Sequence, residues 1–280
     1  MTTPFNGGIK FFNKSQCLLV DGATCEASSG DVVQDFCIDS NPITFWNSVD
    51  SDDTISETLE IVFEEADITR LFLLDHNFKE YTIQWWNGSS YQNFTNVVGL
   101  DGALVGNISE TTYSQDTSYY EFTEVTTRKI LITVVKTQTV NDEKYLNQVI
   151  VTSELGTLTG YPDISKLKHS RSTVTMPMLS GKDIVIKGYA SVSFSLVFKN
   201  YPASYTTDLD LIFTLFDKAD PFLIWLCGGR YGTTYFKYTI RGFRLKDVYQ
   251  CQVEGDLPVD YYKNAYVLPI DSEIKFTEHV

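Results

Sequence analysis

The chain has 280 residues, of which 43% are hydrophobic and 14% aromatic, and its formal net charge is −14. This apolar content excludes intrinsic disorder, because it can offset the entropy lost on folding, and the length predicts about two domains. Residues 1–160 carry 8 basic and 23 acidic side chains, a net charge of −15, whereas residues 161–280 carry 14 and 13. We therefore expect no nucleic-acid binding by the first half, because phosphate contacts need clustered positive charge.

The sequence predicts no membrane span. Its longest apolar runs, residues 209–216 and 221–227, fall well short of the roughly 20 residues that cross a bilayer. The N-terminal residues lack the basic start, apolar stretch and cleavage site of a secretory signal. We therefore expect no membrane insertion and a protein that stays in, or is assembled in, the cytoplasm.

The cysteines are odd in number and show no metal-binding spacing. None forms a CxxC motif and no histidine pair lies near them, so neither a zinc site nor a complete disulfide framework is expected. We interpret them as reduced thiols in small buried pockets, and a redox role is the alternative. They are Cys17, Cys25, Cys37, Cys227 and Cys251.

The first half alternates apolar and polar residues with a period of two, which is typical of half-buried strands. Turn-rich stretches separate these segments, and no sustained helical stripe is present. Residues 1–160 are therefore expected to form a jelly-roll β-sandwich. The predicted strands are residues 58–63, 70–74, 81–85, 119–122, 129–135 and 148–152.

The composition changes after residues 160–163, and a second domain, 161–280, is expected there. Residues 185–198 alternate as a strand, and residues 204–217 form the one credible helix, with Thr206 or Thr207 as its cap and acidic residues in its first turn. Further strands are expected around this helix. The predicted fold is thus mainly β, a jelly-roll sandwich followed by a smaller α+β domain with one short helix.

Two motifs lie near the beginning of the first half. Residues 25–29 read CEASS, and residues 36–48 read FCIDSNPITFWNS. They resemble the opening of discoidin-type domains (coagulation factor type C, galactose-binding-like), where small residues precede an Asp-Gly-Asn-x-x-Thr-x-Trp-x-Ser stretch. The later strands of that family are similar to residues 58–63, 68–85, 127–133 and 146–151.

The resemblance implies a jelly roll that often binds sugars or lipid head groups through loops at one end. Trp46 lies between polar turns and is expected to fill one end of the sandwich, because a large apolar ring is costly to leave in water. Many extracellular members clamp their two ends with a disulfide, whereas this chain has no cysteine between Cys37 and Cys227. This departure argues against an extracellular protein.

Short motifs of the second half read DPFLIWLCGG at 220–229 and YTIRGFRLKDVY at 238–249. With the terminal FTEHV, they resemble tail or baseplate proteins of tailed bacteriophages over the segment after residue 165. The resemblance implies subunit assembly, and Trp225, Arg241 and Arg244 are the candidate interface residues. Both arginines could instead form salt bridges within the domain.

Two adjacent tryptophans mark a candidate ligand site. Trp85 and Trp86 end a predicted strand, so one must point inward and the other outward. An exposed aromatic ring near Tyr91 and an asparagine is what the face of a sugar stacks on. An outward ring in an assembly protein is more often part of a subunit interface, and we favour this interpretation over a glycan site.

A calcium site is a weaker candidate. Asp35, Asp39 and Asn41 place oxygen ligands within one loop, where related jelly rolls sometimes hold a structural calcium. Capping and turn hydrogen bonds explain the same residues without a metal. No other cofactor is expected.

The sequence contains no catalytic motif. His76, His169 and His279 lie in unrelated contexts, and no nucleophile motif or phosphate loop is present. We therefore expect a protein that is not an enzyme.

The leading hypothesis is a structural component of a phage virion tail (tail tip, baseplate or tail tube), located in the virion and assembled in the host cytoplasm. Its expected partners are other virion tail proteins and copies of itself, and the jelly roll would be a decoration or a module facing a host surface glycan. The alternative is a stand-alone carbohydrate-binding lectin.

Overall fold

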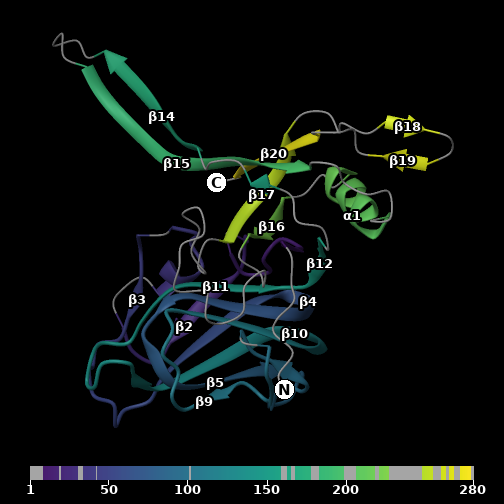
Figure 1. Cartoon of the computed structure of the whole chain (residues 1–280). Helices are drawn as coiled ribbons and strands as arrows, with labels where there is room; N and C mark the ends of the chain where they lie inside the picture. The colour runs from purple at the N-terminus through teal and green to yellow at the C-terminus, as the bar shows by residue number, and fades with distance from the viewer. Residues whose placement is uncertain are drawn as a thin grey trace. The chain divides into compact units, whose positions relative to one another are not determined.

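The computed structural model divides the chain into two compact units, which are described separately. The N-terminal unit consists of the described residues from Phe12 to Glu154, and the C-terminal unit of those in 9–11, 155–226 and 248–278 (Figure 1). Our domain limits, 1–160 and 161–280, stay a prediction, since contacts alone do not show which segment folds by itself. The structure describes residues 9–18, 20–30, 34–41, 43–100, 102–158, 163–164, 168–177, 183–198, 206–217, 221–226, 248–254, 260–262, 265–267 and 272–278.

The N-terminal unit is built from ten strands and a 3₁₀ helix. Its elements are β2 (Thr24–Ala27), η1 (Gln34–Cys37), β3 (Trp46–Asn47), β4 (Glu57–His76), β5 (Phe78–Trp86), β6 (Tyr91–Asn93), β7 (Val97–Val98), β8 (Leu104–Gly106), β9 (Ser109–Glu110), β10 (Thr117–Thr137) and β11 (Tyr145–Thr152).

Two of these strands are longer than the sequence pattern predicts. The expected strands 58–63 and 70–74 are the two ends of β4, and 119–122 and 129–135 both belong to β10. The polar residues between them stay extended because residues 57–74 of β4 pair with residues 117–134 of β10, with register shifts after Glu121 and Thr127. A polar stretch that resembles a turn is here the middle of a strand.

These long strands contribute to both layers of the sandwich. Residues 57–62 of β4 pair with β2 and the end of β10, which continues into β5, β6 and β9; this set is the first layer. Residues 70–76 of β4 pair with β11 and the beginning of β10, which continues into β7 and β8; this set is the second layer. One ladder of strands thus folds over on itself into a β-sandwich.

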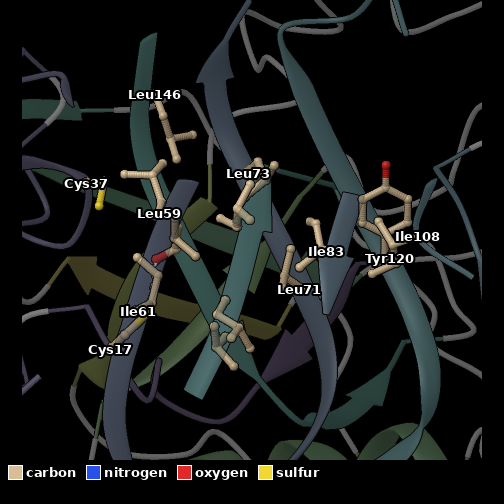
Figure 2. Close-up of a cluster of buried hydrophobic side chains, with 14 of the residues drawn as sticks. Cys17, Cys37, Leu59, Ile61, Leu71, Leu73, Ile83, Ile108, Tyr120 and Leu146 are labelled. Atoms are coloured by element: carbon tan, nitrogen blue, oxygen red, sulfur yellow. Dashed lines mark hydrogen bonds between the residues drawn. The ribbon is translucent and has the colours of Figure 1, made fainter. Parts of the chain in front are cut away.

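The core of the N-terminal unit contains alternate residues of both layers. Figure 2 shows Leu59 and Ile61, from the beginning of β4, in the same cluster as Leu71 and Leu73, from its end. All four side chains are fully buried. Each contributes about 1.5–3 kcal/mol relative to an exposed position, so this cluster dominates the stability of the sandwich.

Trp46 is buried, as expected from its position between polar turns. Its indole N–H donates to the backbone oxygen of Ser29 at 3.1 Å. Gly30 has a φ of +129°, and a Cβ atom there would lie 2.6 Å from Trp46 Nε1. Any side chain at position 30 would therefore clash with the buried ring of Trp46, so this position requires glycine.

The C-terminal unit is a mixture of sheet and helix. Its elements are β1 (Lys10–Phe12), β12 (Glu154–Thr157), β13 (Asp163–Ile164), β14 (Lys168–Pro177), β15 (Asp183–Phe198), α1 (Thr206–Asp217), β16 (Phe222–Trp225), β17 (Val248–Glu254), β18 (Asp260–Tyr262), β19 (Ala265–Val267) and β20 (Ser272–Glu278). The sheet order is β12-β1-β16-β17-β20-β15-β13, with β14 added on β15. The strand β1, from the beginning of the chain, therefore lies between β12 and β16, which come from its second half.

Aromatic rings hold this sheet together. Phe276 of β20 stacks on Phe194 of β15 with ring centroids 5.5 Å apart, and Phe11 of β1 lies 6.0 Å from Phe222 of β16. Phe11 also lies 6.3 Å from Phe276, so the four strands share one aromatic cluster. Aromatic contacts of this kind add to the hydrophobic energy of burial.

The predicted helix is confirmed as α1, Thr206–Asp217. It buries Leu211, Ile212 and Leu215 and exposes Asp210 and Asp217, which is the amphipathic pattern of a helix on a sheet. The mainly β fold is confirmed as well, with α1 as the one α-helix among the described residues. In the part of the chain that the structure describes, no helix is long and apolar enough to cross a membrane.

Candidate functional site

The end of β5 turns its two tryptophans to opposite sides of the first layer, as the alternation of a strand requires. Trp85 packs against the core and donates its indole N–H to the backbone oxygen of Asn93 at 3.3 Å. Trp86 is on the outer surface, where Lys129 Nζ lies 5.9 Å from the centre of its ring. Trp86 is therefore the tryptophan available to a ligand.

Trp86 and Tyr91 form an aromatic pair on this outer surface. The two residues are partners in the β5–β6 ladder, and their ring centroids are 5.1 Å apart in an edge-to-face arrangement. Both side chains are half-buried. The backbone pairing fixes the two rings before any ligand arrives.

An ion pair anchors the second ring. Glu60 of β4 accepts a hydrogen bond from the hydroxyl of Tyr91 and another, at 2.7 Å, from Lys129 Nζ. Burial alone would raise the pKa of Glu60, but these two hydrogen bonds and the lysine charge lower it. Burial and the neighbouring carboxylate raise the pKa of Tyr91, so its hydroxyl stays protonated and donates. We call Glu60, Trp86, Tyr91 and Lys129 the outer-face cluster.

Amide side chains border the cluster. Gln84 Nε2 donates to Asn93 Oδ1 at 3.1 Å across β5 and β6. In the turn between these strands Asn87 Oδ1 accepts the backbone N–H groups of Ser89 and Ser90, both at 2.9 Å. The surface thus combines aromatic rings with fixed polar groups that can donate and accept hydrogen bonds.

The three candidate calcium ligands are in one loop, and at least one side-chain oxygen of each accepts a hydrogen bond from the backbone. Asp35 Oδ1 accepts from the backbone N–H of Cys25 at 3.0 Å, and Asp39 Oδ1 from that of Asn41 at 2.9 Å. Asn41 Oδ1 accepts from the N–H of Ile43. These are the turn and capping bonds of the alternative interpretation. Within the described residues, no group of three or more His, Cys, Asp or Glu side chains could hold a metal ion.

The candidate interface residues are not brought together in the described structure. Trp225, in β16, is completely buried, so its indole offers no surface to a partner. Arg241 and Arg244 lie outside the described residues.

A buried polar chain inside the N-terminal unit was not predicted from the sequence. His76 Nδ1 accepts the backbone N–H of Phe78 at 3.1 Å, so the proton is on Nε2 and is donated to Ser118 Oγ at 2.8 Å. The hydroxyl groups of Ser118, Tyr81 and Tyr120 continue the chain with two contacts of 2.6 Å. Its only signal in the sequence is a set of polar residues within apolar strands.

This buried chain ends on a carboxylate. Tyr120 donates to Glu110 Oε1 at 3.0 Å, which orients every hydroxyl group along the chain. Burial lowers the pKa of His76 to about 3 and raises that of Tyr81. Since His76 already donates to Ser118 and both residues are buried, the pair cannot work as a base and a nucleophile. We therefore interpret this series of hydrogen bonds as a structural feature of the core.

Comparison with known proteins gives similar folds for about half of the chain. No protein-family model matches the sequence, and no curated protein matches it. Solved structures similar to parts of this chain include carbohydrate-binding modules and GH29 fucosidases. Chitosan-binding module 1 of a chitosanase/glucanase from Paenibacillus sp. IK-5 has 16% identity and a TM-score of 0.40, and the match covers 50% of this chain and 98% of the module.

Two further neighbours have comparable values. The family 32 module of C. perfringens NanJ, solved with galactose, is 14% identical over 51% of this chain and 98% of its own, with a TM-score of 0.37. A pectin-binding module is 13% identical over 49% of this chain and 91% of its own, with a TM-score of 0.36.

Proposed function

We propose that the N-terminal unit is a carbohydrate-binding module and that the outer-face cluster is its binding surface. The observation that carries this proposal is the half-exposed pair of Trp86 and Tyr91, held beside the ion pair of Glu60 and Lys129. The role that we propose for this surface is to bind a glycan, without catalysis.

The geometry suits a sugar ring. The C–H face of a sugar ring is apolar and stacks on an aromatic face, while its hydroxyl groups bond to charged and amide side chains. Glu60, Tyr91 and Lys129 hold one another in place, so little side-chain entropy is lost on binding. The indole N–H of Trp86 is covered by protein and has no hydrogen-bond partner among the described residues, and an unsatisfied donor of this kind is found at functional sites.

The negative charge of the first half restricts which kinds of glycan can bind. Residues 1–160 have a net charge of −15, so a polyanionic glycan is repelled at low ionic strength. A neutral or amino-containing glycan meets no such barrier. Among probes, galactose and chitosan oligosaccharides are expected to bind better than pectin.

Binding is tested by isothermal titration calorimetry on the full chain with these three probes and on a glycan array. Trp86→Ala and Tyr91→Ala are each expected to weaken binding at least tenfold, which corresponds to about 1.4 kcal/mol. The matched control is Tyr145→Ala, which removes a half-buried ring of another aromatic pair, with Phe45 at 5.7 Å. Equal losses in Tyr145→Ala, or no binding to any glycan, contradict the proposal.

A second candidate function is assembly into a virion tail, and one observation favours it. β14 and β15 form a long two-stranded ribbon, and among the described strands β14 pairs with β15 alone (Figure 1). The register pairs Val174 with Ile186 and Met176 with Ile184. A two-stranded ribbon is marginally stable by itself in water, and a second copy of the chain is the partner that we propose for this ribbon.

The test of assembly is the mass in solution. Light scattering of the full chain is expected to give an oligomer, and Val174→Ser with Ile186→Ser is expected to reduce it to a monomer. Thr173→Ser with Lys187→Gln, the neighbouring pair of the register, is the control. A wild-type monomer at all concentrations, or absence of the protein from virions, rules this function out.

A further inference from the structure

The N-terminal unit holds two thiols in direct contact. Cys37 Sγ donates to Cys25 Sγ at a distance of 3.1 Å, and both side chains are buried. The four cysteines in the described residues are buried and unbridged. A disulfide bond is about 2.05 Å long, so these two sulfur atoms need to approach by only about 1 Å.

The backbone around the two cysteines is already fixed for such a bond. Cys25 pairs with Ile61 in the β2–β4 ladder, and Cys37 is the last residue of η1. Asp35 ties the two elements together, since its carboxylate accepts the N–H of Cys25 and its carbonyl that of Ile38 at 2.9 Å. Closing the bond therefore requires rotation of side chains and no rearrangement of the chain.

The third thiol of this region has a different partner. Cys17 belongs to the same buried cluster (Figure 2), but its thiol donates to the backbone oxygen of Val149 at 3.4 Å and lies 3.6 Å from Ser15 Oγ. The contacts of the Cys17 thiol are therefore with Ser15 and Val149, whereas Cys25 and Cys37 contact each other.

We propose that Cys25 and Cys37 are a redox-sensitive pair that closes into a disulfide when the chain folds in the presence of a disulfide oxidant. Each thiol gives up one proton and one electron, and a bond forms between their sulfur atoms. The oxidant, a small-molecule or protein disulfide, accepts both electrons and both protons and leaves as two thiols. The product links β2 to η1 across 12 residues of sequence.

The protonation state of the buried thiols explains why the disulfide forms during folding and not afterwards. Burial raises the pKa of Cys17 to about 11, and the hydrogen bond with Cys25, together with burial, raises that of Cys37. Only a thiolate attacks a disulfide, so the thiols of the folded and reduced protein react slowly. Exchange needs an unfolded or locally opened chain, and once formed the bond is shielded in the same way.

The experiment maps disulfides in the full chain. The protein is refolded in a mixture of oxidised and reduced glutathione, free thiols are alkylated under denaturing conditions, and protease fragments are identified by mass spectrometry. The expected result is a linked fragment pair containing Cys25 and Cys37, with Cys17 and Cys251 alkylated. Alkylated Cys25 in the refolded chain, or a link between other cysteines, overturns the proposal.

Two variants sharpen this result. Cys17→Ala is expected to keep the bond, and Cys37→Ala to lose it. In the wild type the bond is expected to raise the thermal midpoint by roughly 5–10 °C over the reduced protein, because it closes a short loop of the unfolded chain. This difference disappears in Cys37→Ala. If that variant does not fold, the fragment map of the wild type decides alone.

Discussion

A tyrosine donates its hydroxyl hydrogen to a glutamate in two regions of the N-terminal unit. Inside the sandwich Tyr120 donates to Glu110, and on the outer surface Tyr91 donates to Glu60. The inner tyrosine is almost completely buried, whereas the outer one is half-buried. The chemistry of the two contacts is the same, and their surroundings differ.

The difference shows how exposure decides what a polar contact does. The inner contact terminates a chain of hydrogen bonds in which every buried donor is paired, and breaking it leaves an unsatisfied group that costs about 1–3 kcal/mol. The outer contact lies next to solvent, which replaces lost hydrogen bonds at little cost. Substitutions of the inner residues should therefore mainly change the free energy of unfolding, and substitutions of the outer residues should mainly change glycan binding.

The largest expected effect is on stability. Tyr81→Ala removes a fully buried ring and two hydrogen bonds, and it is expected to lower the free energy of unfolding by about 3–5 kcal/mol. Tyr91→Ala removes a half-buried ring and is expected to cost at most about 1 kcal/mol while reducing glycan binding. Urea unfolding measures both changes; similar values for the two variants would erase the distinction between the regions.

The next effect is a dependence of stability on pH. His76 has a pKa of about 3 in the folded protein, because burial disfavours its charged form, against an ordinary value of 6.5. The unfolded chain therefore binds a proton below pH 6.5 that the folded chain refuses, and stability falls as the pH decreases from 6.5 towards 3. The slope is about 1.4 kcal/mol per pH unit, or roughly 3 kcal/mol between pH 6.5 and 4.

A single substitution isolates this contribution. His76→Asn keeps an acceptor for the N–H of Phe78 but has no group that titrates in this range. Urea unfolding at several pH values should give a shallower slope for this variant between pH 6.5 and 4. An unchanged slope would assign the pH dependence to other groups.

Much of the fold could be predicted from the sequence because it depends on local patterns. The alternation of residues predicts the strands, and the capped apolar stripe after Thr206 predicts the helix. The orientation of Trp85 and Trp86 follows from their adjacency in a strand. The burial of Trp46 follows from the size of its ring.

The remaining features depend on contacts between segments that are distant in sequence. Nothing local to Lys10–Phe12 indicates pairing with the sheet of the C-terminal unit. The proximity of Cys25 and Cys37, and the contact of Glu60 with Tyr91, arise only when strands pair. Alternation predicts which face a residue occupies, but register decides what it touches.

The smallest expected effect on stability comes from a substitution in the outer-face cluster that should weaken binding and leave folding almost unchanged. Lys129→Gln breaks a partly exposed ion pair with Glu60, a contact that typically contributes about 0–1 kcal/mol. Without the lysine charge the pKa of Glu60 rises, and the polar side of the cluster loses its cation. Glycan binding should therefore weaken several-fold while the urea midpoint hardly moves.

The same layer supplies a matched control for this substitution. Lys136 and Glu80 form a comparable ion pair of 2.5 Å between β10 and β5, and neither residue belongs to the outer-face cluster. Lys136→Gln removes one positive charge, as Lys129→Gln does, so both variants change the net charge of the layer equally. Calorimetry should find unchanged glycan binding in Lys136→Gln, and equal weakening in both variants would mean that overall charge, and not the cluster, attracts the ligand.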